Sequence, residues 1–246
     1  MKIINLIIII ISISLFTNFL KAQQMETRNK NLSLQEQSII SISALTAKGN
    51  LDKLKTALNI GLEAGLTVNE IKEILVHLYA YCGFPRSIRG LQTFMEVMEE
   101  RKRKGLKDKV GKEASKIDET DSKYERGKNI LVKLNQMPQS DILTGYSAFA
   151  PIIDIYLKEH LFADIFERDV LNYIQRELAT ISVITSIGKS EPMLKSHLTI
   201  CMNLGLSPEQ LYEFINVIKT TLGKKEAKSA KRVLNGIRIL KINQSK

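Results

Sequence analysis

The residues of this chain that are best suited to chemistry lie in one short stretch, EIKEILVHLYAYCGFPR, at residues 70–86. Glu73 and His77 are four residues apart, so on a helix their side chains meet one turn from each other. Tyr81 and Cys82 follow within about one and a half further turns. A carboxylate, an imidazole, a phenol and a thiol gathered in this way are suited to acid–base or thiol chemistry. The stretch is therefore the predicted active site.

Each of these residues also has a purely structural interpretation. Glu73 and His77 could form a surface pair worth a few tenths of a kcal/mol. Cys82 could be a small buried hydrophobic residue rather than a reactive thiol. Arg86, which follows the stretch, could be an ordinary surface charge or a clamp for an anion. Another histidine of the chain, His160, is expected to be exposed and inert.

A helix with one apolar face must position the site. Thr67 and Glu70 form a capping box that starts this helix. Pro85 lacks an N–H and disfavours helical geometry in the residue before it, so the helix should end or kink there. A further helix over 87–104 is expected to point Ile88, Leu91, Met95 and Met98 inward. The apolar face of the site helix consists of Ile71, Ile74, Leu75 and Leu78.

An internal repeat organises the rest of the chain. Residues 172–240 follow residues 32–100 at an offset of 139, which becomes 140 after one inserted residue. Matched positions include Gly65 with Gly205, where a helix should end in a left-handed cap. Apolar residues recur at helical spacing in both copies and few stretches alternate, so we predict an all-α fold of two homologous bundles. The expected helices are 34–48, 51–64, 67–82, 87–104, 124–134 and one or two within 151–166.

The two copies differ at the site. His77 is matched by Val217 in the second copy, whereas His197 of the second copy is matched by Ala57 in the first. Each copy thus supplies one histidine that the other lacks. We therefore predict a composite site in which His197 faces His77 across the interface of the repeats.

Composition excludes some classes of protein. The 246 residues contain 44% hydrophobic and 25% charged residues, which is ordinary for a globular protein, and the formal net charge is +10. Residues 101–128 hold eleven Lys and Arg against six Asp and Glu. Because these acids are interspersed and no aromatic residues form a stacking platform, we expect a solvated linker and no nucleic-acid partner.

The N-terminus and the cysteines bear on localisation. Residues 1–22 resemble a secretory signal peptide cleaved near Ala22, so we expect an exported protein, periplasmic or secreted. A membrane contact is expected only if this segment stays uncleaved as an anchor. Cys82 and Cys201 could pair in an oxidising compartment, or remain two separate thiols. The expected organisation is a signal peptide (1–22), a first domain (32–104), a charged linker with a short helix (105–144) and a second domain (145–240).

Three motifs resemble the carboxymuconolactone decarboxylase family, whose fold is shared with alkylhydroperoxidase D: EILVHLYAYCGFP, QRELATISVITSIG and LKSHLTICMNLGLSPEQL. They are similar to those of tandem two-domain members. The resemblance implies two all-α domains, no metal or organic cofactor, a small-molecule substrate and assembly into homo-oligomers.

The resemblance implies two chemistries. The decarboxylases of the family remove CO2 from 4-carboxymuconolactone. In that reaction we expect His77 to be the acid, oriented by Glu73, which raises its pKa. Tyr81 would donate to a lactone oxygen, and Arg86 and His197 would contact the substrate. The peroxidase relatives use a Cys-x-x-Cys pair, of which only Cys82 is present in the first copy.

Three functions therefore remain open. The first is a decarboxylase-like enzyme that acts on a small carboxylated lactone. The second is a peroxidase that uses Cys82, with Cys201 as the one candidate resolving thiol. The third is a helical binding or scaffold protein without catalysis, whose interior would be filled by side chains where an enzyme has its site.

Overall fold

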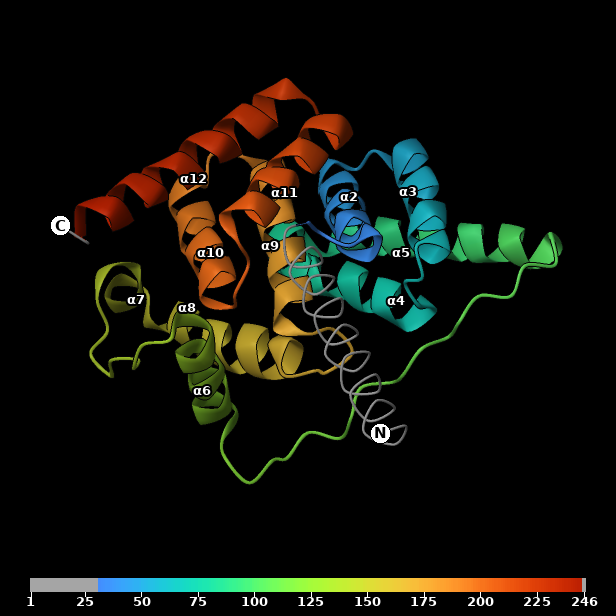
Figure 1. Ribbon diagram of the computed structural model, residues 1–246. Coiled ribbons are helices and arrows are strands. Elements are labelled where there is room, and N and C mark those ends of the chain that lie inside the picture. The colour runs from blue at the N-terminus through green and yellow to red at the C-terminus, as the bar shows by residue number, and fades with distance from the viewer. Residues whose placement is uncertain (1–30, 245–246) are drawn as a thin grey trace, which may run out of the picture.

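The computed structural model describes residues 31–244, with side chains as far as residue 237, and the regular secondary structure of this part of the chain consists of helices alone (Figure 1). The predicted signal peptide lies outside the described residues. The first repeat forms α2 (Leu34–Lys48), α3 (Leu51–Glu63), α4 (Val68–His77) and α5 (Tyr79–Arg103). The second forms α9 (Tyr173–Ile187), α10 (Glu191–Asn203), α11 (Pro208–Thr221) and α12 (Lys224–Gln244). Between them lie α6 (Lys123–Asn135), α7 (Gly145–Phe149), α8 (Pro151–Ile155) and the π-helical segment η1 (Tyr156–Phe166).

Matching caps start the corresponding helices of the two repeats. In each cap, one side chain accepts from the third backbone N–H of the helix while the third side chain accepts from the capping N–H. Gly65 and Gly205, with φ of 96° and 98°, turn the chain after α3 and α10. The duplication predicted from the sequence is therefore present in three dimensions. The capping residues are Ser33, Thr67, Asn172 and Ser207.

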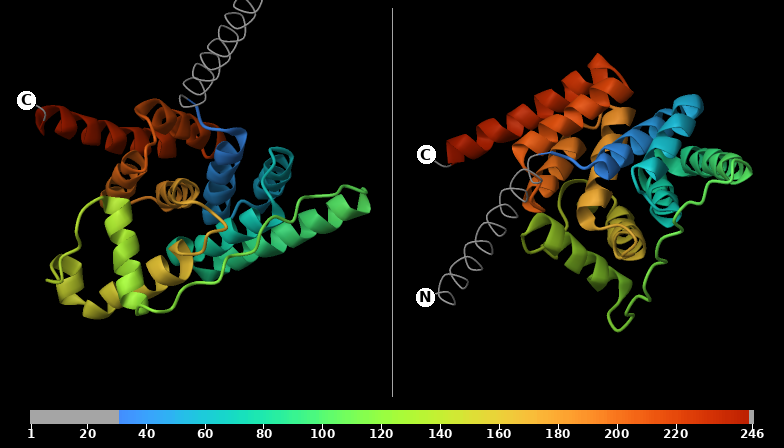
Figure 2. Two further views of the ribbon diagram at one scale, coloured as in Figure 1. Left: turned by 60° about the horizontal axis from the view of Figure 1, so that its bottom comes forward. Right: turned by 45° about the vertical axis from the view of Figure 1, so that its right-hand side comes forward.

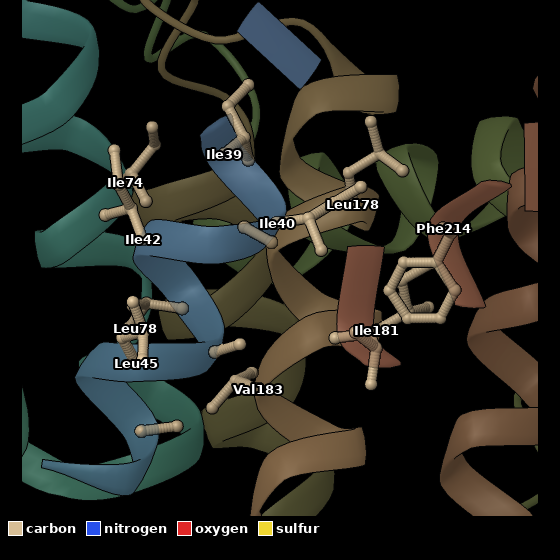
Figure 3. Close-up of a cluster of buried hydrophobic side chains, with 14 of the residues drawn as sticks. Ile39, Ile40, Ile42, Leu45, Ile74, Leu78, Leu178, Ile181, Val183 and Phe214 are labelled. Atoms are coloured by element: carbon tan, nitrogen blue, oxygen red, sulfur yellow. The ribbon is translucent and has the colours of Figure 1, made fainter. Parts of the chain in front are cut away.

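The core forms where α2 packs along α9, the equivalent helices of the two repeats. Figure 3 shows side chains of both helices, among them Ile40 and Val183, in one cluster of buried hydrophobic residues. Both helices are buried along nearly their whole length. Because α2 and α9 share one interior, the repeats form a single hydrophobic core.

The packing of the repeats is reciprocal. Helices α4 and α5 of the first repeat contact α9 of the second, and α11 of the second contacts α2 of the first. Figures 1 and 2 show these crossing contacts on either side of the central α2–α9 pair. Each repeat consequently completes its neighbour, and the helix that carries Glu73 and His77 faces residues of the second repeat.

A kink follows the site residues, as the sequence predicts. α5 is interrupted at Gly83, whose φ of 76° and ψ of 163° are not helical, two residues before Pro85. Beyond the kink, the prediction of the inward face is confirmed for Leu91 and Met98, which pack against the core, and is wrong for Ile88 and Met95, which are 47% and 67% exposed. Ser87 lies in the inward stripe instead, since its hydroxyl donates to the buried carbonyl of Leu75.

The segment between the repeats makes a second apolar cluster. α6 packs on η1, and their buried residues meet Ile200 of α10. Gly127 allows this close packing, because a Cβ built there would lie 1.9 Å from the carbonyl oxygen of Lys158. A π-helical turn is wider than an α-helical one and is often found at functional sites. The cluster consists of Ile130, Leu134, Leu161, Phe162, Ile165, Phe166 and Ile200.

We expect Gly127→Ala to lower the free energy of unfolding by about 1–3 kcal/mol, because α6 and η1 must separate to admit the methyl group. Gly236→Ala is the matched control, since Gly236 is an exposed position of α12 with open space where the added methyl group would lie. There the substitution should stabilise by about 0.5–1 kcal/mol through helix propensity. Urea unfolding of both variants measures the difference, and equal effects would contradict the close packing.

The charged linker is not wholly solvated. The carbonyls of Lys109 and Val110 accept hydrogen bonds from the backbone N–H groups of Val68 and Asn69, which begin α4. Such N–H groups have no partner within their own helix. The linker therefore provides hydrogen-bond acceptors for the first N–H groups of the helix that carries Glu73 and His77.

Within the described residues, no helix is both long and apolar enough to cross a bilayer.

Candidate active site

The predicted site lies where α4 and the start of α5 meet α9. Glu73 and His77 are buried, with 4% and 0% of their surface exposed, and Tyr81 is half-buried. The residues that meet them come from the second repeat and are separated from them by about a hundred positions in sequence. The prediction of a composite site from both repeats thus agrees with the placement of these side chains.

Glu73 pairs with two arginines and makes no hydrogen bond with His77. Its carboxylate accepts from Nε and Nη2 of Arg168 at 3.0–3.1 Å and from Nη2 of Arg176 at 2.8 Å. Burial alone would raise the pKa of Glu73, but the hydrogen bonds from Arg168 and Arg176 outweigh it and the pKa is lowered. Glu73 therefore does not orient His77 as we expected from the sequence. The guanidinium of Arg176 lies between the two side chains and contacts both.

His77 is a neutral imidazole enclosed by the interior. Its ring lies 5.2 Å from that of Phe166 and 5.3 Å from that of Tyr81. Burial, and then the positive charge of Arg176, hold the pKa of His77 well below its usual value. The prediction of a raised pKa is wrong, because Glu73 is already neutralised and the nearest charge is that of a guanidinium.

A hydrogen-bond chain fixes the tautomer of His77. Nη1 of Arg176, which can only donate, lies 3.5 Å from Nδ1 of His77, so Nδ1 accepts. Nε2 then carries the proton and donates to Oγ1 of Thr180 at 2.9 Å. Thr180 in turn donates to the Tyr81 hydroxyl oxygen at 3.1 Å. The phenolic proton of Tyr81 is therefore left for another acceptor.

A second acid–imidazole pair lies on the other side of Tyr81. Nδ1 of His197 on α10 is 2.8 Å from Oε2 of Glu177 on α9. Glu177 is fully buried, and its Oε1 has no hydrogen-bond partner. The Tyr81 ring is 6.3 Å from His197, so it lies between the two histidines that we expected to face each other directly.

Sequence reasoning missed four of these residues, Arg168, Arg176, Glu177 and Thr180. Three of them lie within the stretch QRELATISVITSIG, whose helix carries no other charged residue. A charged pair at Arg176 and Glu177 inside a helix buried on all sides is costly unless each charge has a partner. The contrast between this charged pair and its uncharged neighbours was the signal available in the sequence.

Arg86 lies outside the site. Its side chain is exposed and its guanidinium lies against Gly49, the left-handed residue that ends α2. A positive charge is favourable at a helix C-terminus. The role of an anion clamp predicted for Arg86 is therefore not supported by its position, and Arg168 and Arg176 are the arginines at the site.

Cys82 has the environment of a structural thiol. Its Sγ donates to the carbonyl of Leu78 at 3.2 Å, and burial raises its pKa to about 11 although the charge of Arg86 opposes this. Cys201 is fully buried, and both thiols are free. The thiolate is the reactive form of cysteine, so this environment weakens the peroxidase alternative.

We expect the alkylation of Cys82 by iodoacetamide to be slow at pH 8 and to rise about tenfold per pH unit towards pH 10, because so little thiolate is present. The Cys201→Ser variant isolates the reaction of Cys82, and glutathione is the exposed reference thiol. A rate equal to that of glutathione at pH 8 would contradict the raised pKa. A separate variant, Cys82→Ser, should leave any consumption of peroxide with dithiothreitol unchanged.

The surroundings shelter the site. Phe166, at the end of η1, covers His77, and Tyr81 packs against the α6–η1 cluster. Five hollows of about 400–810 Å³ occur in the described part of the chain, and none of these five is lined by Glu73, His77 or Cys82. His197, whose side chain is 15% exposed, marks the side from which the site meets solvent. Among described residues, no group of three His, Cys, Asp or Glu could hold a metal ion.

Comparison with protein families gives one match that covers both repeats. The family described as the carboxymuconolactone decarboxylase family matches residues 14–94 and again residues 155–236. The two matched regions together exceed half of the chain. Comparison with curated proteins finds no match.

Proposed function

Because the chain belongs to the carboxymuconolactone decarboxylase family, we propose that it is an enzyme that acts by acid–base chemistry, without a cofactor, on a small carboxylated, lactone-like substrate. The observation that carries this proposal is the Glu177–His197 pair, joined at 2.8 Å, beside the free hydroxyl proton of Tyr81. An imidazole oriented by a buried carboxylate, next to a hydrogen-bond donor, is an arrangement suited to proton transfer.

His197 is the proposed proton donor. Glu177 accepts from Nδ1, which leaves Nε2 of His197 to exchange a proton with the substrate. In decarboxylation the bond to the carboxyl carbon breaks, CO2 leaves, and its electron pair moves into the conjugated lactone. A proton from His197 then quenches the resulting dienolate, and solvent restores that proton. Glu177 acts as a positioning residue in this scheme.

Tyr81 is the proposed donor to the lactone oxygen, where negative charge develops. The chain from Arg176 through His77 and Thr180 ends on the Tyr81 oxygen and holds it in place. A preorganised donor of this kind stabilises an oxyanion in a water-poor site. The neutral His77, which sequence reasoning treats as the acid, here acts through Tyr81 as a positioning residue.

One site per chain follows from this proposal. Tyr81 and His77 belong to the first repeat, whereas His197 and Glu177 belong to the second. Neither repeat contains all four groups. None of the five hollows is lined by Glu73, His77 or Cys82, and a filled interior is what the scaffold alternative predicts, so that alternative stays open. The unpartnered oxygen of the fully buried Glu177 carboxylate favours an enzyme, because such a group is costly and brings no packing benefit.

The experiment is an assay of CO2 release from 4-carboxymuconolactone by wild type, His197→Gln and His160→Gln. His160 is the matched control, because it is exposed and pairs with Asp164 on η1 outside the site. We expect release by wild type and His160→Gln and its loss in His197→Gln. Equal release by both variants would overturn the role of His197, and absence of release by wild type would overturn the proposed substrate class.

A further inference from the structure

The duplication places a counterpart of the active site on the opposite side of the α2–α9 pair. There α2 and α3 take the places of α9 and α10, and α11 takes that of α4. Two hydrogen bonds are preserved in this counterpart. Gln37 donates to Glu213 at 3.1 Å, where Arg176 donates to Glu73, and Ser41 lies 3.2 Å from Thr221, where Thr180 contacts Tyr81. The geometry of the site has therefore survived in the second copy.

The groups that do acid–base chemistry are absent from the counterpart. Ala57 takes the place of His197, Ser38 that of Glu177, and Val217 that of His77. Glu213 keeps its carboxylate, but both oxygens are occupied, one by Gln37 and the other by the backbone N–H of Leu32. No side chain that could donate or accept a proton near neutral pH replaces those that are lost, so the counterpart is not suited to the chemistry proposed above.

The smaller residues of the counterpart leave an open space, whereas in the active site the corresponding space is filled by side chains. A hollow of about 400 Å³ lies between α2, α3 and α11, and Ser38, Ala57 and Val217 are all on its wall. The same three positions carry a carboxylate and two imidazoles in the active site. Pockets that bind small molecules in proteins begin at about 300 Å³. The hollow thus results from the loss of three larger side chains.

We infer that this hollow binds a small uncharged molecule with an apolar body and one hydroxyl group. Ala57, Ile60 and Val217 form apolar walls. Both N–H groups of the Gln37 amide donate within the protein, to Leu32 and Glu213, and the Ser41 hydroxyl donates to the carbonyl of Gln37. The amide oxygen of Gln37 and the oxygen of Ser41 therefore remain as acceptors for a hydroxyl group of the ligand. Among the described residues that line the hollow there is no cation to pair with a carboxylate, and the one charged residue at its edge, Glu63, is itself paired with Arg101. A carboxylate that enters such a site without a partner pays the cost of its desolvation. The ligand therefore differs in charge from the carboxylated substrate proposed for the active site, and this inference does not depend on that proposal.

The experiment is a titration of the full-length protein, labelled with ¹³C at Ala, Ile and Val methyl groups, with p-cresol. Shifts of the Ala57, Ile60 and Val217 resonances report binding at this place. The matched ligand is 4-hydroxybenzoate, in which a carboxylate replaces the methyl group. We expect p-cresol to shift these resonances with a Kd on the order of millimolar and 4-hydroxybenzoate to leave them unchanged.

Two variants locate the binding. Ala57→Phe fills the hollow from its wall, and Thr220→Trp covers it from an exposed position on its rim, which keeps the test valid if the first variant does not fold. Each should abolish the shifts at the remaining reporter methyl groups. Unshifted methyl groups in wild type, equal binding of 4-hydroxybenzoate, or binding that survives the folded variants would each overturn the inference.

Discussion

Glu73→Gln should lower the free energy of unfolding by about 3–5 kcal/mol, which corresponds to a fall in Tm of ~6–20 °C for a chain of this size. Glu73 is 4% exposed and neutralises Arg176, which is fully buried. Without the carboxylate, Arg176 becomes a buried charge whose remaining partners, a carbonyl, an imidazole and the ring of Phe166, carry no negative charge. Removing one member of a buried ion pair costs far more than removing a surface pair, because the other charge stays desolvated.

Glu213→Gln is the matched control for that prediction. Glu213 occupies the corresponding position of the second repeat, but its partners are the neutral amide of Gln37 and a backbone N–H. Its loss should cost only about 1 kcal/mol, the usual value of a hydrogen bond. Urea unfolding of both variants measures the difference. Equal losses would contradict the charge imbalance at Arg176.

The same ion pair sets a dependence on pH. The pKa of Glu73 is lowered in the folded protein, so its stabilisation is complete above the ordinary value of 4.5 and is lost as the pH falls through the folded value. The gap in stability between wild type and Glu73→Gln should therefore narrow below about pH 4.5. A gap that stays constant to pH 3 would contradict the lowered pKa.

Glu177→Gln should reduce kcat by about 10²–10⁴-fold, with little change in KM. The amide can present its N–H to Nδ1 of His197 and favour the tautomer with the proton on Nε2. His197 would then lack the orientation and the charge support needed for proton transfer. The measurement is the rate of CO2 release across pH 5–9. Loss of a merely structural residue would not change the shape of this pH–rate profile, whereas loss of a residue that positions His197 should change it.

A measurement of the free energy of unfolding separates a positioning role of Glu177 from a purely structural one. Its Oε1 is buried without a partner, so replacing the carboxylate by an amide should leave the free energy of unfolding within about 1 kcal/mol of wild type. A folded, stable variant with low kcat supports the positioning role. A variant that unfolds at the temperature of the assay, or one with unchanged kcat, would count against it.

The sequence by itself determined the helices and the duplication. Capping boxes at Thr67 and Ser207, the turn at Gly65 and the kink before Pro85 are local features that depend on residues within a few positions of one another. The offset between the two copies was also readable directly. That alignment also showed that the second copy has no histidine at the position of His77 and the first has none at the position of His197. This is why the sequence predicted a site built from both copies.

Only the tertiary structure decided which groups meet. Helical spacing places His77 one turn from Glu73, but it says nothing of a helix 103 positions away that brings Arg176 between them. That guanidinium and complete burial lower the pKa of His77, where the carboxylate alone would raise it. The partner of a buried charge depends on how helices from different repeats pack, because desolvation and Coulomb energy are set by neighbours in space and not along the chain.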